Sequence, residues 1–367
     1  MTTPYVLPVN TLVLVTGANG FIASHTVDQL LKKGFKVRGT VRAPKPWLNA
    51  FFDEKYGEGR FETVTVKNIG DVQELENAMQ GVGGVIHMAT DLTFSSDPHA
   101  VIPWVTDAVR KVLEAASRTK TAQRVVLTSS SRAAYMSSRG STKGVRVDGS
   151  SWNEASIEAA WDPMTPEDAK PFAVYSASKT ECEKAAWAWM RDNQPHFEFN
   201  TVLPDFNTGR ILHPEIAGST MGYVRTLLKG DPSVFDRLPP RKIPFSLSLS
   251  SLLSLCGNSL ICRSPAEWYV DVEDTARLHV IALLSHDVKS RRLFAFAASK
   301  NWTDYVQTLR KLRPNKDLIP EPPANERHDE ADIVLAHQSE TLLKDFFGRQ
   351  GWTPLDESLA AGIEGLD

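Results

Sequence analysis

The chain has 367 residues, a formal net charge of −3 at pH 7 and hydrophobic residues at 42% of its positions. This length and composition are typical of a globular protein with a large core, built as one large α/β unit or two domains. The near-neutral charge provides no polybasic field, so we expect neither nucleic acid nor a membrane surface as partner.

Cysteine and histidine patterns give no sign of metal binding or of a disulfide framework. The three cysteines, Cys182, Cys256 and Cys262, form no CxxC pair, and the nine histidines show no HExxH spacing. The first residues lack the charged segment and apolar core of a secretory signal. We therefore predict no metal and a cytoplasmic protein.

In the first half of the chain, short β-branched runs alternate with helical patterns. Strands are predicted at 12–16, 36–41, 61–66, 85–88 and 125–128. One helix is predicted at 21–33, and a second follows the second strand and ends near residue 56. This alternation is typical of βαβ units, with helices on both faces of a parallel sheet. The predicted fold is therefore α/β, a Rossmann-type doubly wound sheet.

The second half predicts a helix at 173–191 and a strand at 197–203 that Pro204 ends. The regular alternation of strands and helices is then lost. A strand followed by a helix at 268–284, and a further strand at 293–298, predict that the chain returns to the sheet. We therefore expect a cofactor-binding domain at 1–204, rejoined by about 268–300. A smaller substrate lobe would comprise 205–267 and 301–367.

Residues 243–263 differ in composition, with mostly Ser, Leu, Phe, Cys and Pro. Six serines, Pro244 and Gly257 make the stretch a poor membrane helix. Two interpretations remain open: a surface insertion, or a translated, unspliced intron. The second is considered because Ser, Leu and Phe have pyrimidine-rich codons. The residues that flank the stretch can also be encoded by intron boundary sequences. Finding the stretch in spliced transcript would remove the second.

A phosphate-binding turn is indicated by Gly17, Gly20 and Ala23, at GxxGxxA spacing between a strand and a helix. The glycines allow a tight turn and close approach to a pyrophosphate, and the helix N-terminus supplies N–H groups. Between residues 36 and 46 there is no acid to hold a ribose 2′-hydroxyl, but there are Arg38, Arg42 and Lys45. We predict that Arg42 binds the 2′-phosphate of NADPH; the alternative is a solvated basic face.

Carbonyl chemistry is indicated by Tyr175 and Lys179, four residues apart on a predicted helix. A free phenol, with a pKa of about 10, holds its proton tightly, and a neighbouring ammonium favours its ionised form. Ser130 follows a predicted strand, where it could orient a carbonyl oxygen; Ser131 is the second choice. His87 is expected to be a core or cofactor-edge residue.

These motifs resemble those of the extended short-chain dehydrogenase/reductases. Within them, the chain is similar to the dihydroflavonol-reductase-like branch, which includes yeast and fungal aldehyde and ketone reductases. The resemblance rests on residues 15–23, 37–42, 85–90, 126–130, 175–181 and 203–204. It implies a catalytic set of Ser130, Tyr175 and Lys179. It also implies cofactor contacts from Thr16, Gly17, Asn19, Gly20, Phe21, Ile22, Arg42, Lys45, Asn68, Ile69, Ala89, Thr90, Tyr175, Lys179, Pro204, Phe206 and Asn207.

Two departures from the family pattern stand out. Asn68 occupies a position where the branch often has an aspartate that contacts adenine, and residues 243–263 have no counterpart. Substrate contacts are expected from 91–95, 132–135 and 206–221, with Phe94, Phe206 and Met221 indicating an apolar pocket.

The predicted function is reduction of an aldehyde or ketone by NADPH, with Tyr175 as proton donor. An epimerase or dehydratase acting on nucleotide sugars and retaining NAD is one alternative, disfavoured by the basic end of the second strand. A regulator that senses NADP without catalysis is the other. The expected partner is a small carbonyl compound, and the chain is expected to be a monomer or homodimer.

Overall fold

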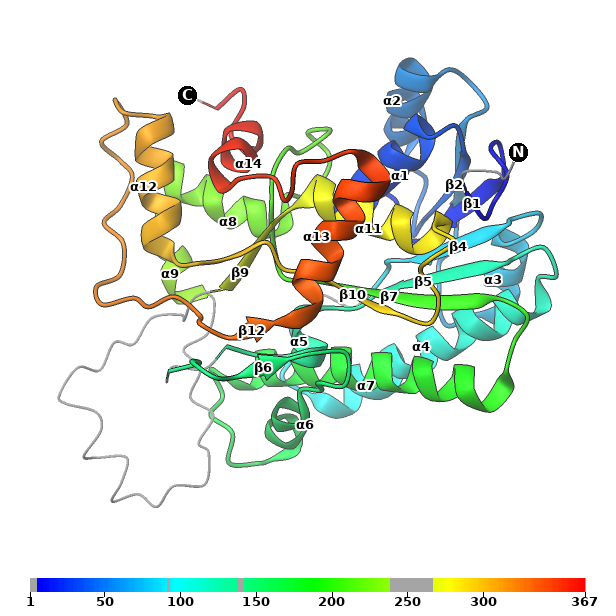
Figure 1. Ribbon diagram of the computed structural model, residues 1–367, viewed down its shortest axis with the longest axis horizontal. Coiled ribbons are helices and arrows are strands. Elements are labelled where there is room, and N and C mark those ends of the chain that lie inside the picture. Colours follow the sequence, from blue (N-terminus) through cyan, green and yellow to red (C-terminus); the bar gives the residue numbers. More distant parts are fainter. Residues whose placement is uncertain (1–4, 91–92, 138–140, 238–266, 367) are drawn as a thin grey trace.

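The computed structural model describes residues 5–90, 93–137, 141–237 and 267–366 (Figure 1). The atypical stretch 243–263 and residues 91 and 92 of the expected substrate contacts lie outside these ranges. Among the described residues, no helix combines the length and apolar character needed to cross a membrane. The same residues contain no group of three His, Cys, Asp or Glu side chains that could hold a metal ion.

A seven-stranded parallel sheet forms the centre of the molecule, in the order β3-β2-β1-β4-β5-β7-β10. Its strands are β1 (Leu12–Val15), β2 (Lys36–Val41), β3 (Phe61–Thr65), β4 (Gly84–His87), β5 (Arg124–Thr128), β7 (Glu198–Pro204) and β10 (Arg292–Ala295). The order reverses between β1 and β4, the switch point at which doubly wound sheets bind ligands. The predicted Rossmann-type fold is confirmed.

Helices cover both faces of this sheet, which explains why its inner strands are apolar runs. One face carries α1 (Phe21–Lys32), α2 (Pro46–Tyr56), α11 (Val272–Leu284) and α13 (Val334–Phe347). The other carries α3 (Val72–Ala78), α4 (Pro98–Arg118) and α7 (Lys170–Asn193), with α6 (Glu154–Trp161) packed on α7. Figure 1 shows α11 and α13 on one side and α4 and α7 on the other.

The smaller lobe has its own core and a second sheet. That sheet has the order β11-β9-β8 and consists of β8 (Phe206–Thr208), β9 (Glu267–Asp271) and β11 (Ala298–Lys300). Around it lie α8 (Ser219–Leu228), α9 (Val234–Arg237), α12 (Trp302–Leu312) and α14 (Leu355–Gly362). Phe206, Tyr269, Trp302 and Tyr305 are buried together in this core.

Two segments differ in detail from the expected division of the chain. The strand expected at about residue 268 is β9, which pairs with β8 and β11 rather than with the main sheet, whereas β10 does return to the main sheet beside β7. Helix α13, from the C-terminal segment, packs on β10 and α11. A short parallel pair, β6 (Arg146–Val147) and β12 (Asp332–Ile333), also joins distant segments.

Candidate active site

The glycine-rich turn lies between β1 and α1, at the switch point of the sheet. Gly17 has a φ of +68°, and a Cβ added to it would lie 3.4 Å from the Cα of Ala89. Gly20 precedes α1, and no side chain caps this helix end. The first N–H groups of a 12-residue helix are therefore available to an anion, as the pyrophosphate of a dinucleotide requires.

A buried hydroxyl fixes this turn to the neighbouring strand. The backbone N–H groups of Met88 and Ala89 donate to Thr16 Oγ1 at 2.9 and 3.0 Å, and His87 Nδ1 lies 2.9 Å from the same oxygen. Burial, with a smaller effect of the Lys179 charge, lowers the pKa of His87 to about 3. His87 is thus neutral, and because Thr16 Oγ1 already accepts two N–H groups, its own proton is directed to Nδ1 of His87.

Strand β2 supports the turn from the other side. Gly17 N–H donates to Thr40 Oγ1 at 3.1 Å, and Ala18 N–H donates to the Thr40 carbonyl at 3.1 Å. A Cβ on Gly39 would lie 2.5 Å from the Ala18 Cβ, so only glycine allows this close approach. The sequence alone assigned no role to Gly39 or Thr40.

The basic residues at and after β2 occupy different surroundings. Arg38 donates to Glu62 and to the carbonyls of Ala78 and Gln80, and so it joins β2 to β3 and to the end of α3. Arg42 is exposed and has no ion-pair partner within the described ranges, whereas Lys45 is half-buried at the start of α2. Arg42, and not Arg38, therefore has a guanidinium available to a ligand.

Asn68 and Ile69 follow β3 at its carboxyl end, the same end of the sheet as the glycine-rich turn. The Asn68 carboxamide oxygen accepts the Gly70 N–H at 2.9 Å, while Glu74 accepts the Lys67 N–H. The side chain of Asn68 is exposed, and its oxygen is used within the loop. An adenine contact would use this amide, whose oxygen can accept one further hydrogen bond and whose NH₂ group can donate.

Helix α7 positions Tyr175 and Lys179 on one face. Lys179 is 5% exposed, and its Nζ donates to Thr90 Oγ1 at 3.1 Å. The same Nζ lies 5.9 Å from the centre of the Tyr175 ring. Because Thr90 follows β4, this contact brings the ammonium and the phenol to the carboxyl ends of the parallel strands.

Ser130 follows β5 and caps the short helix α5 (Ser131–Ala134). Its Oγ accepts the Arg132 N–H at 3.2 Å, and the residue is buried. Ser131, the second choice, is also buried, as the first residue of α5. The predicted serine, tyrosine and lysine thus come from β5 and α7, elements that neighbour the cofactor turn.

Glu183, one helical turn beyond Lys179, is a supporting residue that the sequence alone did not reveal. Its fully buried carboxylate accepts from Ser129 and Thr201 hydroxyls, both at 2.7 Å, and from Arg292 at 2.8 and 3.1 Å. These contacts join the catalytic helix to the strands β5, β7 and β10. A glutamate on a helix normally indicates a solvated face, and no pattern marked this one.

One aromatic side chain, Phe94, packs against the Tyr175 ring. The Phe94 ring lies 5.0 Å from the Tyr175 ring and 5.1 Å from that of Phe172, and Phe94 is 37% exposed with a φ of +52°. Phe206 and Met221, the other residues expected to line an apolar pocket, are instead buried in the lobe core.

The remaining predicted contacts have partners inside the protein. Pro204 ends β7; Asn207, in β8, donates to the Asp205 carbonyl and accepts from Thr275 Oγ1 at 2.6 Å. Tyr135 donates to Asp329. The side chains of Phe206 and Asn207 are therefore engaged inside the protein, and the Asn207 carbonyl accepts from Thr220.

A cavity of about 680 Å³ lies at the amino-terminal ends of the strands, opposite the candidate site, and is lined in part by Asn10, Lys36, Arg60 and Gly83. None of the predicted catalytic or cofactor residues lines it. The chemistry of the side chains, rather than the size of this cavity, therefore locates the candidate site.

Comparison with known proteins agrees with this fold. The NAD dependent epimerase/dehydratase family matches residues 13–203. Ketoreductase adrE of Penicillium roqueforti is 44% identical over 98% of this chain and 97% of its own, and aldehyde reductase 2 of Sporidiobolus salmonicolor is 35% identical over 96% and 95%.

Among solved structures, yeast methylglyoxal/isovaleraldehyde reductase Gre2, complexed with NADPH, has a TM-score of 0.73 at 23% identity, over 96% of this chain and 97% of that one. This likeness supports the fold, and the relatives named as a ketoreductase and an aldehyde reductase confirm the prediction of an oxidoreductase that acts on carbonyl groups. The chain belongs to the NAD dependent epimerase/dehydratase family, the extended short-chain dehydrogenase/reductases that its motifs resemble.

Proposed function

We propose that the chain reduces an aldehyde or ketone to an alcohol with NADPH, and that Tyr175 donates the proton. The observation that carries the proposal is the buried Lys179, in contact with Thr90 and 5.9 Å from the Tyr175 ring. Relatives named as a ketoreductase and an aldehyde reductase support the same chemistry.

The residues of the cofactor side fit a dinucleotide. The uncapped N-terminus of α1 and the turn at Gly17 suit the pyrophosphate, and Arg42 suits a 2′-phosphate. Asn68 and Ile69 would contact the adenine, and the segments at Ala89 and Pro204 would follow the nicotinamide half. When bound, the reduced nicotinamide supplies the hydride.

The chain itself would bind and protonate the oxygen. The Ser130 and Tyr175 hydroxyls would hydrogen-bond the carbonyl oxygen, and Tyr175 would transfer its proton as the carbonyl carbon is reduced. Lys179 would favour the phenolate that remains, and it can also hold the ribose hydroxyls. Phe94, which packs against the Tyr175 ring, would shield one side of that ring from water.

An activity assay separates the proposed reaction from its alternatives. A reductase consumes NADPH when a panel of aldehydes and ketones is supplied. An epimerase that retains NAD shows no net consumption, and a sensor binds NADPH without turnover. Absence of consumption with every carbonyl compound, despite tight NADPH binding, would overturn the proposal.

Arg42→Asp tests the preference for NADPH. The substitution replaces a partner of the 2′-phosphate by a partner of the 2′-hydroxyl, so kcat/KM should fall for NADPH by about tenfold or more and rise for NADH. Lys36→Asp is the matched control, because it makes the same charge change at the other end of β2. An unchanged cofactor preference in Arg42→Asp would contradict the assignment.

The domain assignment follows from the same proposal. The cofactor would bind to 1–204 and about 268–300, and the lobe would supply the substrate contacts. A monomer or homodimer, and a cytoplasmic location, stay predictions.

A further inference from the structure

A continuous series of hydrogen bonds, the α11 series, joins two parts of the proposed site that are far apart in the sequence. At the end of β5, Thr128 Oγ1 lies 2.8 Å from Nε2 of His279, and Nδ1 of His279 lies 2.8 Å from the Thr275 carbonyl oxygen. The Thr275 hydroxyl donates to the side-chain oxygen of Asn207 at 2.6 Å. Thr128 is two residues before Ser130, and Asn207 lies in β8, directly after the segment proposed to follow the nicotinamide half.

The position of each proton in the α11 series follows from the groups present. A carbonyl can only accept, so Nδ1 of His279 carries the hydrogen and donates it to Thr275. Burial lowers the pKa of His279 to about 4, so the ring is neutral and its Nε2 is an acceptor. The Thr128 hydroxyl therefore donates to Nε2. Each hydrogen bond then has one donor and one acceptor, and an apolar side chain at 279 would leave partners unpaired at both ends.

One helical turn of α11 carries the centre of the series. His279 and Thr275 are 0% exposed, and α11 packs on β5, β7 and β8. Asn207 is also held by its own neighbours, because its NH₂ group donates to the Asp205 carbonyl and its carbonyl accepts from the Thr220 hydroxyl. A buried polar network in which every group is paired favours one arrangement of the elements that it joins. The α11 series therefore fixes the end of β5 relative to β8.

We propose that the α11 series positions the reacting groups: its Thr128 end fixes the loop that carries Ser130, and its Thr275 end fixes β8 on the nicotinamide side. This inference rests on the proposed function. Thr128, His279 and Thr275 are positioning residues, because they act through Ser130 and Asn207. Their effect is on geometry, since displacement of a reacting group by about 1 Å can lower a rate on the order of a hundredfold.

Breaking the two ends separately should give two different effects. Thr128→Val removes the donor to His279, so kcat for a carbonyl compound should fall about fivefold or more while the Kd for NADPH stays within about twofold of wild type. Thr275→Val removes the donor to Asn207, so the Kd for NADPH should rise about fivefold or more, with a smaller change in kcat. Thr128→Ser and Thr275→Ser keep the hydroxyls and should restore both values.

Thr165→Val is the matched control. Thr165 is another buried threonine, and its hydroxyl donates to the Ala159 carbonyl at 2.7 Å, beside α6. This variant should lose stability and leave kcat and the Kd for NADPH unchanged. The proposal is overturned if Thr128→Val and Thr275→Val behave in the same way, or if both change kcat and Kd in the same proportion, because the α11 series would then have a structural role alone.

Amide hydrogen exchange in the presence of NADPH gives a readout that needs no turnover. Exchange should rise in the peptide 128–135 in Thr128→Val, in the peptide 204–209 in Thr275→Val, and in both peptides in His279→Leu. If His279→Leu does not fold, the two valine variants still decide the question. Failure of the proposed reductase activity would leave the exchange and the NADPH affinity to be measured, and exchange equal to wild type in both peptides of the valine variants would overturn this inference.

Discussion

The Thr16 hydroxyl explains how the cofactor turn is fixed at the switch point of the sheet. It accepts two backbone N–H groups of the segment after β4, so its single proton is directed to His87. This arrangement requires an unprotonated His87 Nδ1, in agreement with the low pKa of that residue. A neutral ring also avoids repulsion with the nearby Lys179.

Thr16→Val tests this arrangement. Valine has a similar shape but leaves the partly buried N–H groups of Met88 and Ala89 without this acceptor, which should lower the free energy of unfolding by about 2 kcal/mol. NADPH binding should weaken as the turn loses its support. Thr16→Ser, which keeps the hydroxyl, is the control in denaturant unfolding and NADPH titration, and equal behaviour of the two variants would contradict this account.

Among the secondary-structure elements, α7 depends on the buried Glu183 for its position on the sheet. Arg292 donates to this carboxylate through Nε and Nη2, and its guanidinium lies 4.0 Å from the centre of the Trp152 ring. The carbonyls of Gly149 and Ser151 accept its remaining nitrogen. The pair is therefore fully hydrogen-bonded, the condition under which buried charges are tolerated.

Glu183→Gln should lower the free energy of unfolding by about 3 kcal/mol or more, because it leaves the buried Arg292 without a counter-charge. The double variant with Arg292→Met should recover part of this loss. Lys184→Met is the control on the same helix, since Lys184 forms an exposed pair with Glu154 and should contribute less than about 1 kcal/mol. Equal losses in Glu183→Gln and Lys184→Met would contradict the role of Glu183.

The sequence predicted the strands of the main sheet because the central ones are apolar runs buried on both faces, and β-branched residues also mark β2 and the edge strand β3. It also predicted the local motifs of the site, the glycine turn and the Tyr175 and Lys179 pair. It did not reveal the pairing of β9, because periodicity does not specify a partner strand. Arg132 was expected to contact substrate, but its carboxylate partner, Glu267, is 135 residues away, and the partner of Glu183 is 109 residues away. Such contacts depend on the tertiary fold.

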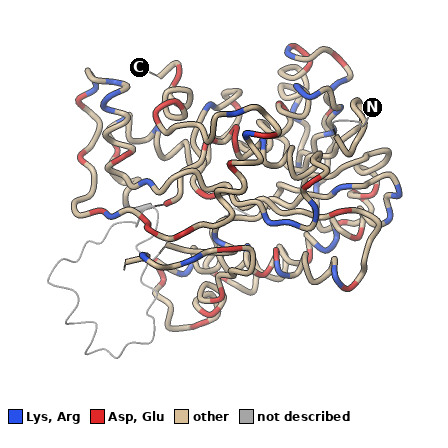
Figure 2. The backbone as a smooth tube through the Cα atoms, viewed as in Figure 1, with Lys and Arg blue, Asp and Glu red and all other residues tan. Residues whose placement is uncertain are grey.

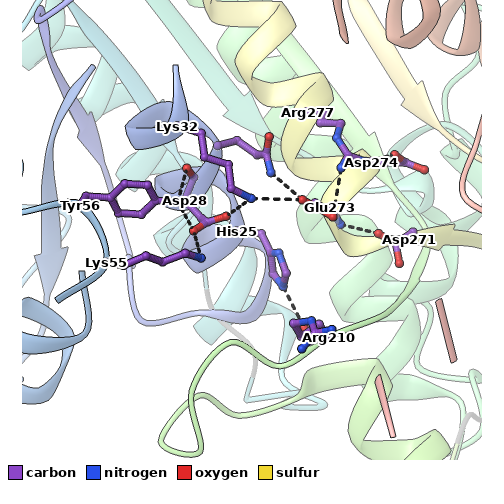
Figure 3. A network of polar contacts seen from close by, with 11 residues as sticks. His25, Asp28, Lys32, Lys55, Tyr56, Arg210, Asp271, Glu273, Asp274 and Arg277 are labelled. Carbon is purple, nitrogen blue, oxygen red and sulfur yellow. Dashed lines mark hydrogen bonds and ion pairs between the residues drawn. The ribbon is translucent and has the colours of Figure 1, made fainter. Parts of the chain in front are cut away.

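In the whole molecule, a polar network connects α1, the helix after the glycine-rich turn, to the smaller lobe (Figure 3). On α1, the buried Asp28 binds Lys55 and Tyr56 of α2, and His25 contacts the Arg210 carbonyl after β8. Glu273 of α11 accepts from Gln29 of α1. Elsewhere, acidic and basic residues are interspersed over the described chain (Figure 2).

Asp271 lies where β9 of the lobe joins α11. It accepts from Ser358 of α14 at 2.6 Å and from the Glu273 N–H at 2.8 Å. Burial raises the pKa of Asp271 to about 6. A raised folded-state pKa gives a contribution to stability that is present below the ordinary aspartate pKa and lost as pH rises through about 6.

Asp271→Asn removes this titration: its amide oxygen can accept the Glu273 N–H, and its NH₂ group can donate to the Ser358 hydroxyl that the carboxylate accepted from. Relative to wild type, the variant should gain free energy of unfolding between about pH 4 and pH 6, on the order of 2 kcal/mol, and keep that gain at neutral pH. Denaturant unfolding across this pH range measures the difference. Asp287→Asn on the surface is the control. If the difference in free energy of unfolding between Asp271→Asn and wild type did not change with pH, the titration of the buried Asp271 would be contradicted.

The central claim is that Tyr175 donates the proton, and Tyr175→Phe tests it most directly. NADPH binding is followed by fluorescence, and NADPH consumption is followed with a carbonyl compound that the wild-type protein reduces. The account predicts that binding persists while turnover falls about a hundredfold or more. Turnover at the wild-type rate with NADPH still bound would contradict it.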